Sequence, residues 1–114
     1  MTGMTRTILV LAALAAACGG MSGPAAPSDL KAEPLSGGAH LTWKDNSTNE
    51  AQFMIERKTG TGSFATVGTV PFDTTQYHDA PVTSGTTYVY RVMAVGSAGH
   101  ASGVPSNEVT FNAP

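Results

Sequence analysis

The sequence predicts an all-β protein that folds as a sandwich of seven strands. Seven runs of strand-like composition are separated by clusters of Gly, Pro, Asn, Asp or Ser, a spacing typical of β-sandwiches. Several runs alternate apolar and polar residues with a period of two, so that one side of each strand can face a core. After residue 17 no stretch shows helical periodicity, and the thirteen Gly and seven Pro of the chain disfavour helices.

The alternation and the turn residues place the strands, in chain order, at 29–33, 39–44, 52–58, 64–70, 75–79, 86–96 and 107–112. The first follows a Pro and precedes another, and a Ser-Gly-Gly turn separates it from the second, which alternates up to Trp43. The third begins after a polar Asp-Asn-Ser-Thr-Asn loop, and a Gly-rich turn separates it from the fourth. A Pro-Phe-Asp turn precedes the fifth strand, a Pro turn ending in Ser-Gly precedes the sixth, and a Gly- and Ser-rich loop precedes the seventh.

The same alternation predicts which side chains form the core. Trp43 is the only Trp, and its inward position makes it the expected centre of the sandwich. Each large side chain buried there contributes about 1.5–3 kcal/mol to folding. The expected core residues are Leu30, Leu41, Trp43, Phe53, Ile55, Tyr77, Tyr88, Tyr90, Val92 and Val109.

Residues 1–17 have the features of a secretory signal peptide. A positive flank at Arg6 precedes an unbroken apolar run at 8–17, which is shorter than the roughly 20 apolar residues that span a bilayer. Cys18 follows directly and is the only Cys of the chain, so no disulfide is expected within the fold. Residues 18–27 are mostly Gly, Ser, Ala and Pro, a composition that predicts a short tether.

The position of Cys18 is similar to that of the lipidated Cys in the lipobox of bacterial lipoproteins. This resemblance implies that Cys18 is diacylated and becomes the new N-terminus, and two acyl chains anchor a protein stably at a membrane. The sequence departs from the family pattern, which usually has Leu three residues before the Cys; here Ala15 stands there, and Leu14 lies one position too early. Cleavage after Ala17 by an ordinary signal peptidase, which yields a soluble secreted or periplasmic protein, remains the alternative.

Three later segments, LTWKDNSTNEAQFMIERKTGTGSF, TTQYHDAPVTSGTTYVYRVMAV and PSNEV, resemble bacterial fibronectin type III domains over 28–112. The resemblance implies an immunoglobulin-like sandwich in which the first, second and fifth strands form one sheet and the other four form the second. It also implies that Tyr88 is the corner tyrosine, whose hydroxyl bonds to a backbone acceptor within 81–85. Domains of this family are binding and spacer modules far more often than enzymes.

Composition and motifs exclude several classes of function. Eight Asp and Glu stand against six Lys and Arg, and no basic stripe is concentrated enough for nucleic-acid binding. The chain has no G-x-S-x-G elbow, no phosphate-binding Gly loop before a helix, and no nucleophile with an adjacent base. We therefore expect no enzymatic activity and no cofactor.

Two groups of polar residues contain side chains that can bind metals, but simpler explanations account for both. The loop at 45–50 lacks the Asp-x-Asn-x-Asn-Gly pattern of calcium loops, and Asx turns explain its composition. His40 and His78 face outward on strands expected to be neighbours, where cross-strand pairs approach to about 5 Å. Zinc sites need three or four ligands, and the sequence places no third ligand nearby. We therefore expect solvated surface histidines and no metal.

One surface has the composition of a contact site, namely the outer face of the sheet formed by 52–58, 86–96 and 107–112. Apolar side chains there are accompanied by a charged pair, Glu56 and Arg91, expected to meet across two strands. We call this surface the candidate interaction face and define it by Met54, Glu56, Val89, Arg91, Met93 and Val95.

These observations favour a non-enzymatic binding or display module of a bacterial cell envelope, anchored by lipid at Cys18. Its partner would be a protein or glycan of the envelope. Two alternatives stay open: a carbohydrate-associated module, and a purely structural envelope lipoprotein without a specific ligand. Because Trp43 and the three Tyr are expected to point inward, they leave no exposed aromatic platform for a sugar, which disfavours the carbohydrate-associated module.

Overall fold

Seven strands make up the computed structural model, which describes residues 23–97 and 104–114. The predicted signal peptide, Cys18 and His100 lie outside the described residues, so signal cleavage and lipidation stay predictions. The strands are β1 (Ser28–Leu35), β2 (Gly38–Lys44), β3 (Glu50–Thr59), β4 (Ala65–Pro71), β5 (Gln76–Asp79), β6 (Thr87–Gly96) and β7 (Val109–Asn112).

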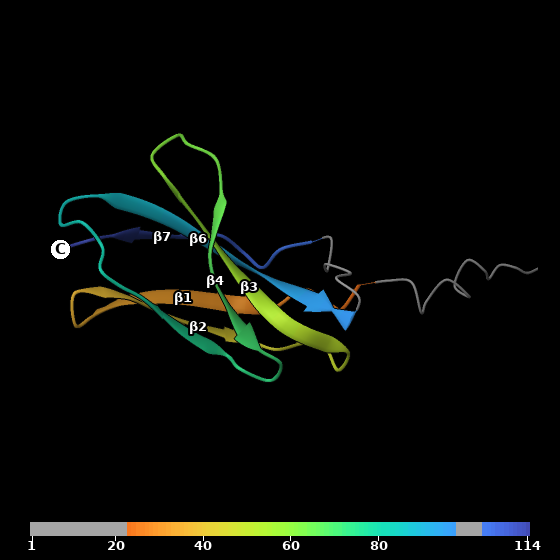
Figure 1. Ribbon diagram of the computed structural model, residues 1–114. Helices are drawn as coiled ribbons and strands as arrows, with labels where there is room; N and C mark the ends of the chain where they lie inside the picture. The colour runs from red at the N-terminus through yellow and green to blue at the C-terminus, as the bar shows by residue number, and fades with distance from the viewer. Residues whose placement is uncertain (1–22, 98–103) are drawn as a thin grey trace, which may run out of the picture.

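The strands form two antiparallel sheets with the orders β1-β2-β5 and β4-β3-β6-β7, stacked as the two layers of a sandwich (Figure 1). This confirms the predicted fold class and the predicted membership of each sheet. β1 runs further than expected and includes Pro34, which pairs with Ala39. Proline is tolerated there because β1 is an edge strand, where the missing N–H removes no inner ladder bond.

Inward-facing side chains of both sheets fill the core between the layers. Trp43 is 6% exposed and meets the ring of Phe53 edge-on, with 5.6 Å between the ring centroids. Eight of the ten expected core residues are buried. The other two, Tyr77 and Val109, are half-buried and pack against the margin of the core, because each lies on an edge strand.

Tyr88 bonds to the turn that precedes β6, at the position that the family resemblance implied. The backbone N–H of Thr83 donates to the Tyr88 hydroxyl over 2.8 Å. The hydroxyl is therefore the acceptor of this bond, whereas the expectation had it bonding to an acceptor in the turn. The hydroxyl accepts because the backbone N–H of Thr83 lies outside the strands and needs an acceptor that no strand ladder provides.

A buried polar cluster joins the two sheets beside the apolar core. Asp79 on β5 points inward and accepts hydrogen bonds from Arg57 on β3 and from Tyr90 on β6. The Arg57 guanidinium also lies 5.1 Å from the ring centroid of Tyr88. Side chains of three strands thus meet at one carboxylate.

The two ends of the sandwich carry different loops. The start of β1, the β2–β3 loop and the β4–β5 turn lie at one end, and the C-terminus lies at the other (Figure 1). The side-chain amide of Asn46 donates to the Ala26 carbonyl over 3.0 Å and to the Ser28 hydroxyl over 2.9 Å, and Pro27 is buried. The last residues of the predicted tether therefore lie against the domain.

Within 23–97 and 104–114 no helix has the length and apolar character needed to cross a membrane.

Candidate functional site

The candidate interaction face lies on the outer side of the four-stranded sheet, where cross-strand pairing brings its residues together. Met54 on β3 pairs with Met93 on β6, and Glu56 pairs with Arg91. Val89 pairs with Lys58 two residues further along, which is the next pair on the same face. These side chains are half-buried, because neighbours on the same face cover part of each one.

The charged pair on this face is well formed. Arg91 Nε lies 2.6 Å from Glu56 Oε1, as the pairing of the two strands predicts. The Arg91 guanidinium also stacks over the ring of Phe64, 3.9 Å from its centroid, and the Lys58 ammonium lies 4.9 Å from the same centroid. Phe64 therefore covers part of the face with an aromatic ring flanked by two cations.

Val95 does not belong to this surface, although alternation places it there. The side chain is buried, with 6% of its area exposed. A β-bulge between Glu50 and Gln52 lies directly opposite, since Glu50 pairs with Gly96 and Gln52 pairs with Val95. The extra residue in β3 interrupts the period-two pattern at this end of the sheet, so the expected exposure of Val95 is wrong.

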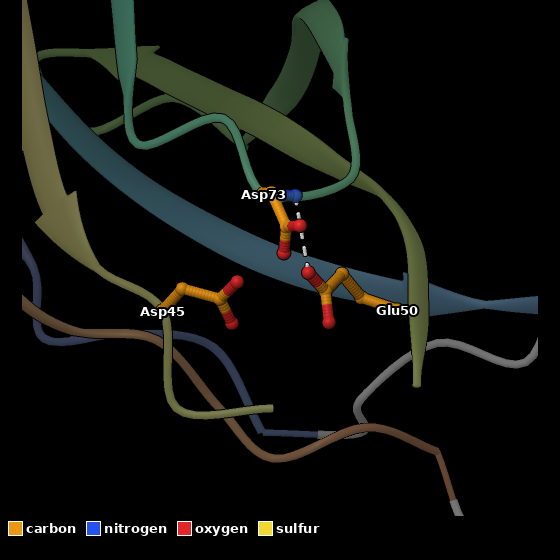
Figure 2. Close-up of side chains that lie close together, drawn as sticks. All are labelled: Asp45, Glu50 and Asp73. Atoms are coloured by element: carbon orange, nitrogen blue, oxygen red, sulfur yellow. Dashed lines mark hydrogen bonds between the residues drawn. The ribbon is translucent and has the colours of Figure 1, made fainter. Parts of the chain in front are cut away.

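Three carboxylates gather at the end of the sandwich where β1 begins. Asp45 is the first residue of the β2–β3 loop, Glu50 is the first residue of β3, and Asp73 lies in the β4–β5 turn (Figure 2). One oxygen of each lies within 4.8 Å of one oxygen of the others. Asp45 and Glu50 belong to one loop of the sequence, whereas the proximity of Asp73 does not follow from the sequence, because Asp73 is 23 residues from Glu50 along the chain.

Hydrogen bonds within this acidic cluster account for its arrangement. Glu50 Oε1 accepts from the Ser47 hydroxyl over 2.8 Å, and Oε2 accepts from the Asp73 backbone N–H over 3.1 Å. The Ser47 backbone N–H donates to Asp45 Oδ1 over 2.9 Å, which is the Asx turn that the loop composition predicts. Glu50 thus ties the β2–β3 loop to the β4–β5 turn.

The environment of this cluster shifts two pKa values in opposite directions. Burial by itself would raise the pKa of Glu50, but hydrogen bonds from its own backbone, from Ser47 and from Asp73 outweigh burial and hold the pKa below its ordinary value. The pKa of Asp73 is raised by desolvation and by its contact with the Glu50 carboxylate. Oxygen donors of this kind suit Ca²⁺, but the bonds described above already use both oxygens of Glu50.

The two histidines are direct cross-strand neighbours on the outer side of the three-stranded sheet. His40 on β2 pairs with His78 on β5, and their ring centroids lie 6.1 Å apart. The sequence by itself indicates no third ligand near them. The structure places Glu33 opposite His40 on β1, so the three residues form one row across the sheet.

A pocket of about 380 Å³ lies at the opposite end of the sandwich, around the β1–β2 turn and the start of the segment after β5. Leu35 is half exposed at its wall. The lining residues are Pro34, Leu35, Ser36, Gly37, Gly38, Val82, Ser84 and Pro114. Sequence reasoning missed this pocket because it is assembled from three segments far apart in the chain.

Phe72 is an exposed aromatic residue that strand alternation does not place. It lies in the β4–β5 turn beside Asp73, and 61% of its area is exposed. The inward positions expected for Trp43 and the Tyr residues concern strands, so they do not predict whether a Phe in a turn is buried or exposed. The available signal for exposure is the position of Phe72 in a Pro-Phe-Asp turn, outside any alternating strand.

Solved structures show what this sandwich is similar to. An Fn3-like protein from Clostridium thermocellum is 31% identical, with a TM-score of 0.66, and the match covers 82% of this chain and 96% of that one. The FN5 domain of Drosophila Lar is 23% identical, with a TM-score of 0.63, over 80% of this chain and 97% of that domain. Pectate lyase PelI from Erwinia chrysanthemi, in complex with tetragalacturonic acid, is 25% identical with a TM-score of 0.66; the match covers 76% of this chain but 28% of the lyase.

No family model and no curated protein matches the chain. The fold and the paired strands define an immunoglobulin-like sandwich of the fibronectin type III class. The identity to the clostridial protein over nearly all of that protein's length shows that the chain belongs to the Fn3-like family. This fold is commonly a binding or structural module.

Proposed function

We propose that this protein is a non-enzymatic binding module of a bacterial cell envelope that contacts a partner protein through its candidate interaction face. The observation that carries the proposal is the pairing of Met54 with Met93 beside the ion pair of Glu56 with Arg91. Unbranched thioethers adapt to irregular surfaces, and a charged pair at the rim adds orientation. The described strands form two layers, so no third layer covers this face within 23–97 and 104–114.

The ion pair and its aromatic cover make part of this face rigid. Arg91 is held by Glu56 on one side and by Phe64 on the other. A side chain fixed before binding loses less conformational entropy when a partner arrives. Arg and aromatic residues are also the residue types that contribute most to protein interfaces.

The contact is tested by introducing a charge on this face. Met54→Glu and Met93→Glu each place an unpaired charge where a partner would bury it, so both should abolish capture of a partner from envelope extract. Circular dichroism and melting curves establish that each variant is folded. Thr42→Lys, on an exposed position of the other sheet, is the matched control and should capture normally.

The results separate the proposal from its rivals. Capture that survives in folded Met54→Glu and Met93→Glu variants would exclude this face as the contact. Because both methionines are half-buried, Met93→Gln serves as a milder variant if the Glu forms unfold. A wild-type protein that captures nothing would favour the purely structural role.

The proposal includes anchoring through lipid on Cys18, which rests on the lipobox-like sequence. The described segment 23–27 enters the domain at the end that carries the acidic cluster and Phe72. A lipid at Cys18 would therefore place that end toward the membrane and the Leu35 pocket away from it. Mass spectrometry of the mature N-terminus tests this, with Cys18→Ser as control; an unmodified Cys18 in a soluble protein would exclude the anchor.

A carbohydrate-associated role is the second candidate, because Phe72 is exposed and the pectate lyase contains a similar domain. A single aromatic ring in a turn can stack on a sugar. Binding to a panel of plant and bacterial polysaccharides that is lost in Phe72→Ala would favour this role. Retention of protein capture by the same variant would keep the interaction face as the principal site.

A further inference from the structure

Glu33, His40 and His78 form one row across the outer side of the three-stranded sheet. Glu33 on β1 is the register partner of His40 on β2, and His40 is the register partner of His78 on β5. Partners in an antiparallel sheet project to the same side, and their Cβ atoms lie about 4.5–5.5 Å apart. Three metal-ligating side chains from three strands therefore share one patch of surface.

The geometry of the two imidazoles suits one shared ion. An ion bonded at about 2.0–2.1 Å to one nitrogen of each ring, at a tetrahedral angle, holds the ring centroids roughly 5 Å apart, so the two rings must approach each other by about 1 Å to share it. The centroids of His40 and His78 lie 6.1 Å apart, and the rings are tilted by 42°. Small rotations of the two side chains are enough to aim one nitrogen of each ring at a common point.

His40 also carries an unsatisfied polar atom. Its Nδ1 is buried and has no hydrogen-bond partner. A buried polar atom without a partner is rare in folded proteins, and coordination or bonding of an ion is one way in which such a group is satisfied. This observation applies to His40 alone, because His78 is exposed and can be satisfied by water.

We propose that Glu33, His40 and His78 bind a divalent transition-metal ion of the Zn²⁺ class. Two imidazoles and one carboxylate form a ligand set known for zinc, and three protein ligands leave a fourth position open for water or for a donor from a bound partner. Imidazole ligands select Zn²⁺, Cu²⁺ or Ni²⁺ over Ca²⁺ and Mg²⁺, which prefer oxygen. The ligand atoms of the three residues are not gathered at one point in the structure, so the exposed Glu33 must turn its side chain toward the imidazoles to complete the set.

This site is independent of the interaction face. It lies on the sheet β1-β2-β5, whereas Met54 and Met93 lie on the other sheet. It is also separate from the acidic cluster, whose ligands are all oxygens. Failure of the metal site would leave the proposed protein contact untouched, and the reverse also holds.

Titration of the purified protein with ZnCl₂, followed by calorimetry and by NMR of the histidine side chains, tests the proposal. We expect saturable binding of one Zn²⁺, chemical-shift changes in both His40 and His78, and a melting temperature that rises with zinc and returns with EDTA. CaCl₂ should produce none of these changes.

Variants identify the ligands. His78 is exposed, so His78→Ala should fold normally and weaken zinc binding about tenfold or more, which corresponds to ~1.4 kcal/mol. Glu33→Gln should weaken binding while leaving both histidine shifts responsive to zinc. His100→Ala is the matched histidine control, and Thr42→Ala is the control for a neighbouring position on β2; neither should change the affinity. Zinc binding that survives His78→Ala, or that is lost in His100→Ala, would overturn the assignment, as would the absence of saturable binding to the wild-type protein.

Discussion

The hydroxyl of Tyr90 on β6 donates a 2.6 Å hydrogen bond to the carboxylate of Asp79 on β5 and so joins the two sheets through the interior. Arg57 on β3 donates to the same oxygen over 2.8 Å. Asp79 is buried, and these two donors satisfy its carboxylate away from water. A carboxylate held by donors from the opposite sheet fixes how the two layers are aligned at this end of the core.

Tyr90→Phe should destabilise the domain by about 1.5–3 kcal/mol, because the buried carboxylate loses one of its donors. Urea denaturation followed by tryptophan fluorescence measures the change. Thr110→Val, at an exposed position of the neighbouring strand β7, should stay within about 0.5 kcal/mol of wild type. An unchanged midpoint in Tyr90→Phe would mean that the bond contributes nothing net.

The same bond predicts a loss of stability in alkali. Burial, and then the hydrogen bond to Asp79 and its charge, raise the pKa of Tyr90 above its ordinary value of 10.0. A raised pKa means that the contribution is complete below the unfolded pKa and is lost as the pH rises through about 10 and above. The stability difference between wild type and Tyr90→Phe should therefore shrink above about pH 10, and a difference that stays constant would contradict the shift.

Trp43→Ala should cost about 3–5 kcal/mol, because a large side chain at the centre of the core is replaced by a cavity. Domains of this size have total stabilities of about 5–15 kcal/mol, so much of the variant should be unfolded at ambient temperature. Thermal melts followed by circular dichroism measure the loss. Thr42→Ala, one residue earlier and facing solvent, should melt nearly as wild type does.

Gly68→Ala should destabilise the domain by about 1–3 kcal/mol through overpacking. A Cβ on Gly68 would overlap the ring and hydroxyl of Tyr77, which packs across from β5 onto β4. The Tyr77 hydroxyl donates to the Val67 carbonyl over 3.1 Å, so the ring is held in place and cannot yield freely. Thr69→Ala, next to it but exposed, is the control. Equal stability of the two variants would show that the ring can move aside.

Glu50→Gln should lower stability at neutral pH by about 1 kcal/mol, since a charged acceptor becomes a neutral one. The pKa of Glu50 is lowered from 4.5, so its contribution is present above that value and is lost as the pH falls through the folded pKa. The difference between wild type and variant should disappear in acid below that window, as pH-dependent urea denaturation would show. Asp73→Asn is the control with the opposite sign: the pKa of Asp73 is raised, so this variant should not lose stability at neutral pH.

The candidate site was only partly predictable from sequence. The pairing of Glu56 with Arg91 follows from alternation and from strand order, and both are local properties of two long strands. The burial of Val95 depends on a β-bulge, and no residue of the strand predicts that bulge. Asp73 lies near Glu50 because a turn brings distant segments together, and Glu33 lies beside His40 because of strand register. Neither position could be predicted from composition.

The sequence by itself determined the number of strands, their approximate bounds and the inward positions of Leu41, Trp43 and Phe53. These properties depend on period-two alternation and on turn residues, which are local features of the sequence. Only the tertiary structure decided that Asp79 points inward to Tyr90 and that His40 stands between Glu33 and His78. Contacts of this kind depend on strand register and on sheet alignment, which are settled by packing of the whole core at once.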